Sequence, residues 1–86
     1  MPIISRFYGI SILMYFNEHN PPHFHAKYEG QIAAFNIETG RVVAGELPPK
    51  AMKLVKEWLK IHKEELLLDW QIAKNKGELK DIEPLL

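Results

Sequence analysis

A helical pattern in the second half of the chain limits the fold more than any other feature. From Lys50 to Lys76 apolar residues recur at spacings of three and four, which predicts an amphipathic helix. A straight helix of ~27 residues would be ~40 Å long, whereas a compact domain of this size is only ~30 Å across. We therefore expect a break near residues 62–64. The apolar stripe consists of Met52, Val55, Leu59, His62, Leu66, Trp70 and Ala73.

Before the helix, four segments alternate between apolar and polar residues, as strands with one buried face do. Two of the connections, Glu29-Gly30 and Thr39-Gly40, look like two-residue hairpin turns, because glycine accepts the positive φ that such turns require. Pro49 suits the first turn of the helix, and Gly77 suits its end. The four predicted strands cover residues 10–17, 23–28, 31–38 and 41–47.

The predicted fold class is α+β. We expect a four-stranded antiparallel β-meander with two C-terminal helices, or one kinked helix, packed on one face. A single domain should cover residues 1–86. Within it, the meander is placed at 10–47, the helical part at 49–76 and an irregular tail at 77–86.

Two-residue turns fix the strand register by counting. The row beside His25 then holds the small residues Ala34 and Gly45, which would leave a shallow depression on the outer sheet face. A β-bulge in either hairpin would change this pairing. The predicted pairs are Tyr28–Gln31, His25–Ala34 and His23–Asn36 in the first ladder, and Ala34–Gly45 and Asn36–Val43 in the second.

The same register sorts residues between core and surface. Ala44 is expected to face the core and Leu47 the outer face. Trp58 and Trp70 are expected to anchor the core. The predicted core consists of Ile10, Ile12, Met14, Phe16, Phe24, Phe35, Ile37, Val42, Val55, Trp58, Leu59, Leu66 and Trp70.

Composition removes several kinds of function. The chain has no cysteine, which excludes disulfides, thiolate metal sites and cysteine catalysis. Its formal net charge is zero, which argues against non-specific coating of DNA and leaves little repulsion to oppose self-association. No apolar run approaches the ~20 residues needed to cross a bilayer. We expect a cytoplasmic protein.

Histidines concentrate in one short stretch. His19, His23 and His25 fall within seven residues around Pro21-Pro22. Residues two apart on a strand project from the same face, so His23 and His25 are suitably placed for a metal, with His19 as a third ligand and Glu18 as the nearest carboxylate. Three neutral imidazoles suit zinc or another divalent transition metal, and an open position would activate water for hydrolysis, with RNA as one candidate substrate.

Two other interpretations of the stretch stay open. Histidine beside proline often bonds backbone groups and holds a corner, which is a structural role. Alternatively, the histidines carry out metal-free acid–base chemistry, with Arg6, Lys27 and Tyr15 neutralising a phosphate. His62 lies on the apolar helix stripe and is expected to be a partly buried residue at a helix junction.

Two sets of helix residues suggest binding surfaces. One apolar set lies away from the main stripe and favours contact with a small protein partner or a second copy of the chain: Leu54, Ile61, Leu68 and Ile72. A second set forms a cationic strip that would suit RNA, DNA or an acidic partner, or that is simply a solvated face interleaved with Glu57 and Glu64: Lys50, Lys53, Lys56, Lys60 and Lys63.

Three motifs point to a known family. They are Ile-Ser-Arg-Phe-Tyr-Gly-Ile at 4–10, Met-Tyr-Phe-Asn-Glu-His-Asn-Pro-Pro-His-Phe-His-Ala at 14–26, and the later run that contains Trp58, His62 and Trp70. Together they resemble bacterial domain-of-unknown-function family 4160, over nearly the whole chain. The positions that match are Arg6, Tyr8, Gly9, His19, Pro22, His23, His25, Trp58, His62 and Trp70.

The resemblance implies a small cytoplasmic protein with a small protein partner, without assigning any residue a role. Members are often encoded beside a second uncharacterised family, number 2442, and such pairs are sometimes catalogued as toxin–antitoxin modules. The leading hypothesis is therefore a non-enzymatic interaction module, one half of a two-gene regulatory pair. The alternatives are a hydrolase or metal-binding protein that uses the histidines, and a nucleic-acid-binding protein that uses the lysine strip.

Overall fold

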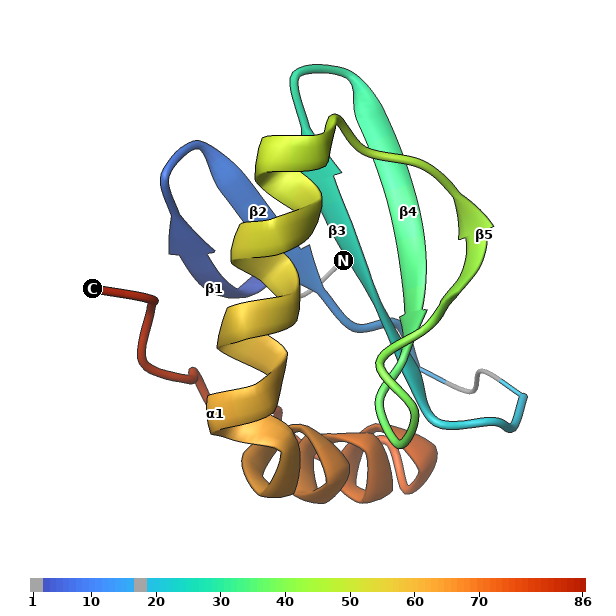
Figure 1. The fold of residues 1–86 in the computed structure, drawn as a ribbon. Helices are drawn as coiled ribbons and strands as arrows, with labels where there is room; N and C mark the ends of the chain where they lie inside the picture. The colour runs from blue at the N-terminus through green and yellow to red at the C-terminus, as the bar shows by residue number, and fades with distance from the viewer. Residues whose placement is uncertain (1–2, 17–18) are drawn as a thin grey trace.

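The computed structural model describes residues 3–16 and 19–86 and has a five-stranded antiparallel sheet and one C-terminal helix (Figure 1). The α+β class is confirmed, with five strands where four were predicted. The strands follow one another across the sheet in chain order. They are β1 (Ile3–Phe7), β2 (Ile10–Leu13), β3 (His23–Tyr28), β4 (Gln31–Asn36) and β5 (Val42–Gly45), and the helix is α1 (Pro49–Lys74).

The additional strand is β1, which pairs antiparallel with β2. Tyr8 and Gly9 connect them with φ angles of 50° and 79°, a turn in which both central residues are left-handed. Such a turn follows the right-handed twist of the strands. The segment before Gly9 is short and mixed in polarity, so its pattern does not predict a strand. The glycine turn next to the apolar run was the signal in the sequence that could have indicated a hairpin there.

The β3–β4 hairpin has the predicted register. His23 faces Asn36, His25 faces Ala34 and Tyr28 faces Gln31. Glu29 and Gly30 have φ angles of 46° and 83°, as a two-residue turn with two left-handed positions requires. Counting from this turn was therefore sufficient to align the two strands.

The predicted β4–β5 register is wrong, by one residue at Ala34 and by two at Phe35. Ala34 faces Ala44, not Gly45, because the connection is longer than two residues and the ladder shifts between Ala34 and Phe35. Asn36 closes the longer loop by accepting the backbone N–H groups of Glu38 and Thr39 at its Oδ1. The pairs formed are Ala33–Gly45, Ala34–Ala44 and Phe35–Val42.

The shift exchanges two faces near β5. Ala44, predicted to be buried, is exposed, whereas Leu47, predicted to be outside, joins the core. Val42 is only half-buried. Phe16, also predicted in the core, is 42% exposed because β2 ends at Leu13 and the alternation stops there. The other predicted core residues are buried, including both tryptophans.

Of the two predicted alternatives, two helices or one kinked helix, the structure has one helix with a kink at His62, whose φ of −111° and ψ of 21° are non-helical. Figure 1 shows the first half of α1 lying across the sheet and the second half turning along the sheet's lower end. The kink therefore fits a 26-residue helix onto a body whose longest extent is 33 Å. After Lys74 the left-handed residue is Lys76, with φ of 56°, where the prediction had Gly77.

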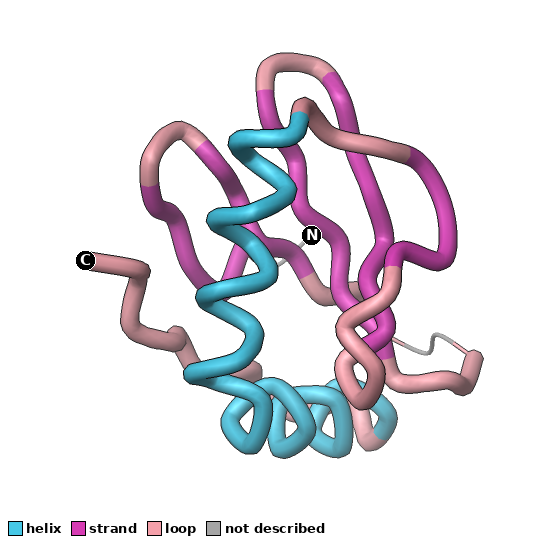
Figure 2. Tube along the Cα trace, viewed as in Figure 1, coloured by secondary structure: helices cyan, strands magenta, loops and turns pink. Residues whose placement is uncertain are grey.

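The segment after α1 returns to the sheet and completes the core. Ile82 is buried, and its N–H donates to the carbonyl of Ile4 in β1. The indole N–H of Trp58 donates to the carbonyl of Glu83 at 2.8 Å. Figure 2 shows this segment passing beside β1. This segment is thus irregular yet packed against the sheet.

Among the described residues, α1 is too polar along its length to serve as a bilayer-crossing span.

Candidate functional site

The histidine stretch leads into the central strand β3, and its two strand histidines lie on the sheet face opposite the first half of α1, which we call the outer face. His23 and His25 project from β3 on this face and are half-buried, and His19 is exposed. The corner between them contains a cis peptide bond at Asn20–Pro21. Glu18, the predicted carboxylate ligand, lies outside the described residues.

Aromatic packing surrounds the two strand histidines. The rings of His23 and His25 meet edge to face with centroids 5.5 Å apart. The ring centroids of Trp70 and His23 are 5.1 Å apart, and those of Tyr15 and His25 are 4.7 Å apart. His23 Nδ1 is 2.8 Å from the carbonyl oxygen of Pro21, so Nδ1 carries the hydrogen and donates it. These contacts are those of a packed corner.

Residues 3–16 and 19–86 bring together no group of three histidines or carboxylates that would hold a metal ion. His19, His23 and His25 therefore do not form a ligand set by themselves in this structure. Metal binding and hydrolysis at this stretch stay predictions.

Two other predicted residues do reach the outer face. Arg6 faces Ser11 across β1 and β2, and Ser11 faces Lys27 across β2 and β3, so the three share one row. Arg6 and Lys27 are exposed. The outer face therefore gathers two cations beside the histidine row. The next row on this face runs through His25, Ala34 and Ala44, so Ala44 stands where Gly45 was predicted.

The predicted apolar interaction residues divide into two pairs. Ile61 and Leu68 on α1 are each 66% exposed. Leu54 and Ile72 are half-buried, and Leu54 packs against the core. Their role in binding stays a prediction.

The predicted lysine strip lies along a groove. The groove has a volume of about 800 Å³ and runs between the first half of α1 and the loop that joins β4 to β5. Four of the five predicted lysines line it, and Lys50 does not. Its lining consists of Ile37, Glu38, Thr39, Gly40, Arg41, Pro49, Met52, Lys53, Lys56, Glu57, Leu59, Lys60 and Lys63.

The floor of the groove is aliphatic. Ile37 and Leu59 are 1% and 4% exposed, and Met52 is half-buried beside them. All three belong to the core or pack against it. A floor that is part of the core is held in place by the rest of the molecule.

The loop wall of the groove is fixed by hydrogen bonds. The Asn36 N–H donates to the carbonyl of Arg41, and the Gly40 N–H donates to the carbonyl of Asn36, both at 2.8 Å. The Lys63 ammonium group donates to the carbonyl of Glu38 at 3.0 Å and joins the loop to α1. The two walls are therefore tied together at one end.

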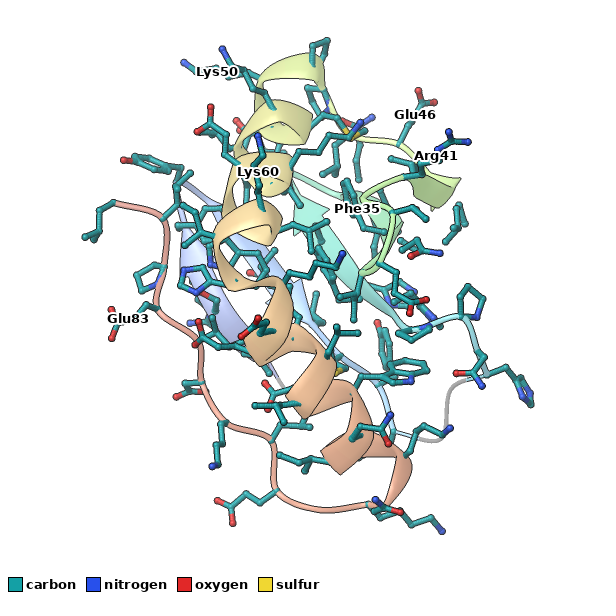
Figure 3. The ribbon with its side chains drawn as sticks, turned by 60° about the horizontal axis from the view of Figure 1, so that its bottom comes forward. Phe35, Arg41, Glu46, Lys50, Lys60 and Glu83 are labelled. Atoms are coloured by element: carbon teal, nitrogen blue, oxygen red, sulfur yellow. The ribbon has the colours of Figure 1, made fainter. Side chains whose placement is uncertain are left out.

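The charge of the groove differs from that of the chain. Five cationic side chains and two carboxylates line it, a net charge of +3, whereas the whole chain has a net charge of zero. His62 Nδ1 lies 2.6 Å from Glu65 Oε1, and neither residue lines the groove. Figure 3 shows Lys60 on α1, Arg41 on the strand side and Phe35 between helix and sheet.

The lysine strip was predicted from the sequence, but the groove was not. Arg41 and the loop residues were missed because they face α1 only after the sheet and helix have packed. The periodicity of lysines on a helix carries no information about the opposite wall.

Comparison with curated proteins finds no match, and neither does comparison with solved structures. A family model described as Domain of unknown function (DUF4160) matches residues 9–71. That range contains β2 to β5, most of α1, the histidine stretch and the whole groove lining. The match confirms the resemblance seen in the sequence motifs, and the chain belongs to the DUF4160 family.

Proposed function

We propose that the protein is a non-catalytic module that binds a partner protein in the groove between α1 and the β4–β5 loop. The observation that carries the proposal is the combination of an aliphatic floor and a cationic rim in one groove. Protein-binding and ligand-binding sites combine apolar contact with a few placed polar groups in this way.

A protein partner fits the lining better than nucleic acid does. Single-stranded nucleic acid is usually held by aromatic stacking as well as cations, and the described lining is aliphatic. Glu38 and Glu57 also lie in the groove, where they would repel a phosphodiester backbone. Family membership and the reported pairing of such genes support a small partner, as one half of a two-gene regulatory pair would have.

A second copy of the chain is the alternative partner. Ile61 and Leu68 expose apolar surface on α1, away from the groove. If self-association uses them, Ile61→Glu with Leu68→Glu should turn a larger species into a monomer in sedimentation experiments, while the groove substitutions below should not.

Site-specific photocrosslinking in the host cell tests the proposal. A photoreactive amino acid in place of Lys56, inside the groove, should give one discrete protein adduct that mass spectrometry identifies. The same amino acid in place of Lys27, on the outer face, is the matched control and should not give that adduct. The adduct should disappear when Lys60→Glu is added.

A nucleic-acid adduct at position 56, or the same adducts from positions 56 and 27, would contradict the proposal.

A further inference from the structure

We infer that the segment bound in the groove is amphipathic and acidic, with aliphatic side chains on one side and carboxylates on the other. The inference rests on the proposed function and names the partner's chemistry at the same site. It follows from the floor, the spacing of the cations and the position of the two carboxylates.

The floor selects aliphatic side chains. Ile37, Met52 and Leu59 present only carbon and sulfur to the groove, so a polar group placed there would lose its water without gaining a partner. A leucine or isoleucine side chain placed there gains free energy by leaving water. Because methionine adapts its shape, the floor tolerates more than one such side chain.

The rim selects carboxylates at a regular spacing. Lys53, Lys56 and Lys60 follow one another at intervals of three and four residues, which corresponds to steps of about 4.5 and 6 Å along the helix axis. A helical segment with carboxylates at the same intervals would place one acid opposite each lysine. Arg41 offers a fork of donors from the opposite wall.

The two carboxylates favour a peptide over any uniformly charged polymer. A polypeptide can place a neutral or basic residue beside Glu38 or Glu57, whereas a phosphodiester carries a charge at every link. The groove is therefore charged in a pattern, with five cations and two anions, that a sequence of mixed residues can match.

Direct binding measurements with defined probes test the inference. The first probe is a fluorescein-labelled twelve-residue peptide with leucine and glutamate at helical spacing. Three others are a version with glutamine for glutamate, one with serine for leucine, and a twelve-nucleotide single-stranded RNA. Fluorescence anisotropy measures Kd at two salt concentrations, and amide chemical shifts locate the site. Binding should weaken with salt, and the shifts should concentrate at Gly40, Arg41 and Lys56–Lys60.

The charge-reversal variant Lys56→Glu with Lys60→Glu should weaken binding of the acidic peptide at least about tenfold. Lys27→Glu with Lys74→Glu is the matched control, since it makes the same change in net charge on exposed residues outside the groove, and should alter Kd less than about twofold. The peptide with glutamine for glutamate and the peptide with serine for leucine should each have a Kd that is higher by a similar factor.

Tighter binding of the RNA than of the acidic peptide would overturn the inference, as would equal effects of the groove and control variants. A protein adduct at position 56 whose bound segment is neutral or basic would overturn it while leaving the proposed function in place. If the photocrosslinking and the peptide-binding measurements both fail, the inference and the proposed function are both wrong.

Discussion

Asp69 places a carboxyl group in the interior of the molecule, where it is 2% exposed. Oδ1 accepts the backbone N–H of Lys80 at 3.1 Å, whereas Oδ2 is buried without a hydrogen-bond partner among the described residues. Burial raises the pKa of this carboxyl above its ordinary value, and the N–H and charge of Lys80 only partly oppose the effect. The native state therefore holds the Asp69 proton more tightly than the unfolded chain does.

The tighter binding of the Asp69 proton in the native state predicts how the free energy of unfolding changes with pH. Between the ordinary carboxyl pKa and the raised native value, the folded state binds more protons, so the free energy of unfolding should fall as pH rises. Asp69→Asn should abolish that fall while keeping an acceptor for the Lys80 N–H. Urea unfolding at a series of pH values from 4 to 7 measures it. Glu46→Gln, at an exposed position, should leave the slope unchanged, and an unchanged slope in Asp69→Asn would contradict the argument.

At the scale of the elements, the β4–β5 ladder depends on one glycine. Gly45 has a φ of +71°, and a Cβ built on it would lie 2.1 Å from the carbonyl oxygen of Ile32. Because that oxygen belongs to the backbone of the neighbouring strand, the sheet itself would have to move. The residue thus permits the close approach of β5 to β4 at the Ala33–Gly45 pair.

Gly45→Ala should lower the free energy of unfolding by at least about 3 kcal/mol, since left-handed strain and overpacking add. Gly30→Ala is the matched control: it has a φ of +83° but no atom within 4 Å of the added Cβ, so only the strain of about 1–2 kcal/mol applies. Chemical denaturation of both variants gives the comparison. Equal losses would show that the close approach to Ile32 does not matter.

Features that depend on residues close together in the sequence were predicted correctly, whereas features that depend on distant contacts were not. The β3–β4 register came out correctly because a two-residue turn determines it, and the kink at His62 followed from helix length against domain size. The predicted β4–β5 register was wrong because Asn36 closes a loop longer than two residues and the ladder shifts between Ala34 and Phe35. Strand β1 was not predicted, because a short segment of mixed polarity can be identified as a strand only once its partner strand is known.

At the scale of the whole molecule, the segment after α1 acts as a further layer over β1 and Trp58. Ile82 is 5% exposed, and its backbone bonds β1. Ile82→Ala should therefore lower the free energy of unfolding by about 2–4 kcal/mol, because it opens a cavity in the core. Leu86→Ala, at a residue 99% exposed, should change it by less than about 0.5 kcal/mol. Thermal and urea unfolding measure both, and similar values would mean that the segment is not part of the core.

The candidate site shows the same division between local and distant information. The histidine stretch and the lysine strip were both visible as patterns of neighbouring residues. The groove was not, because its walls come from residues 37–41 and 49–63, which meet only in the folded chain. Charge distribution gives a partial signal. Residues 1–63 contain eight basic and five acidic residues and residues 64–86 three and six, so the zero net charge conceals two oppositely charged parts.

The hydrogen bond between Ile82 and Ile4 also bears on how the protein is made. The first strand leaves the ribosome early, yet its outer edge gains this partner only when residues near 82 have been added. At roughly 5–20 residues per second, about four to fifteen seconds separate the two events. During that time the nascent chain presents an open strand edge, which is a hazard for aggregation. Chaperone dependence during synthesis should thus concern the first residues of the chain more than the last.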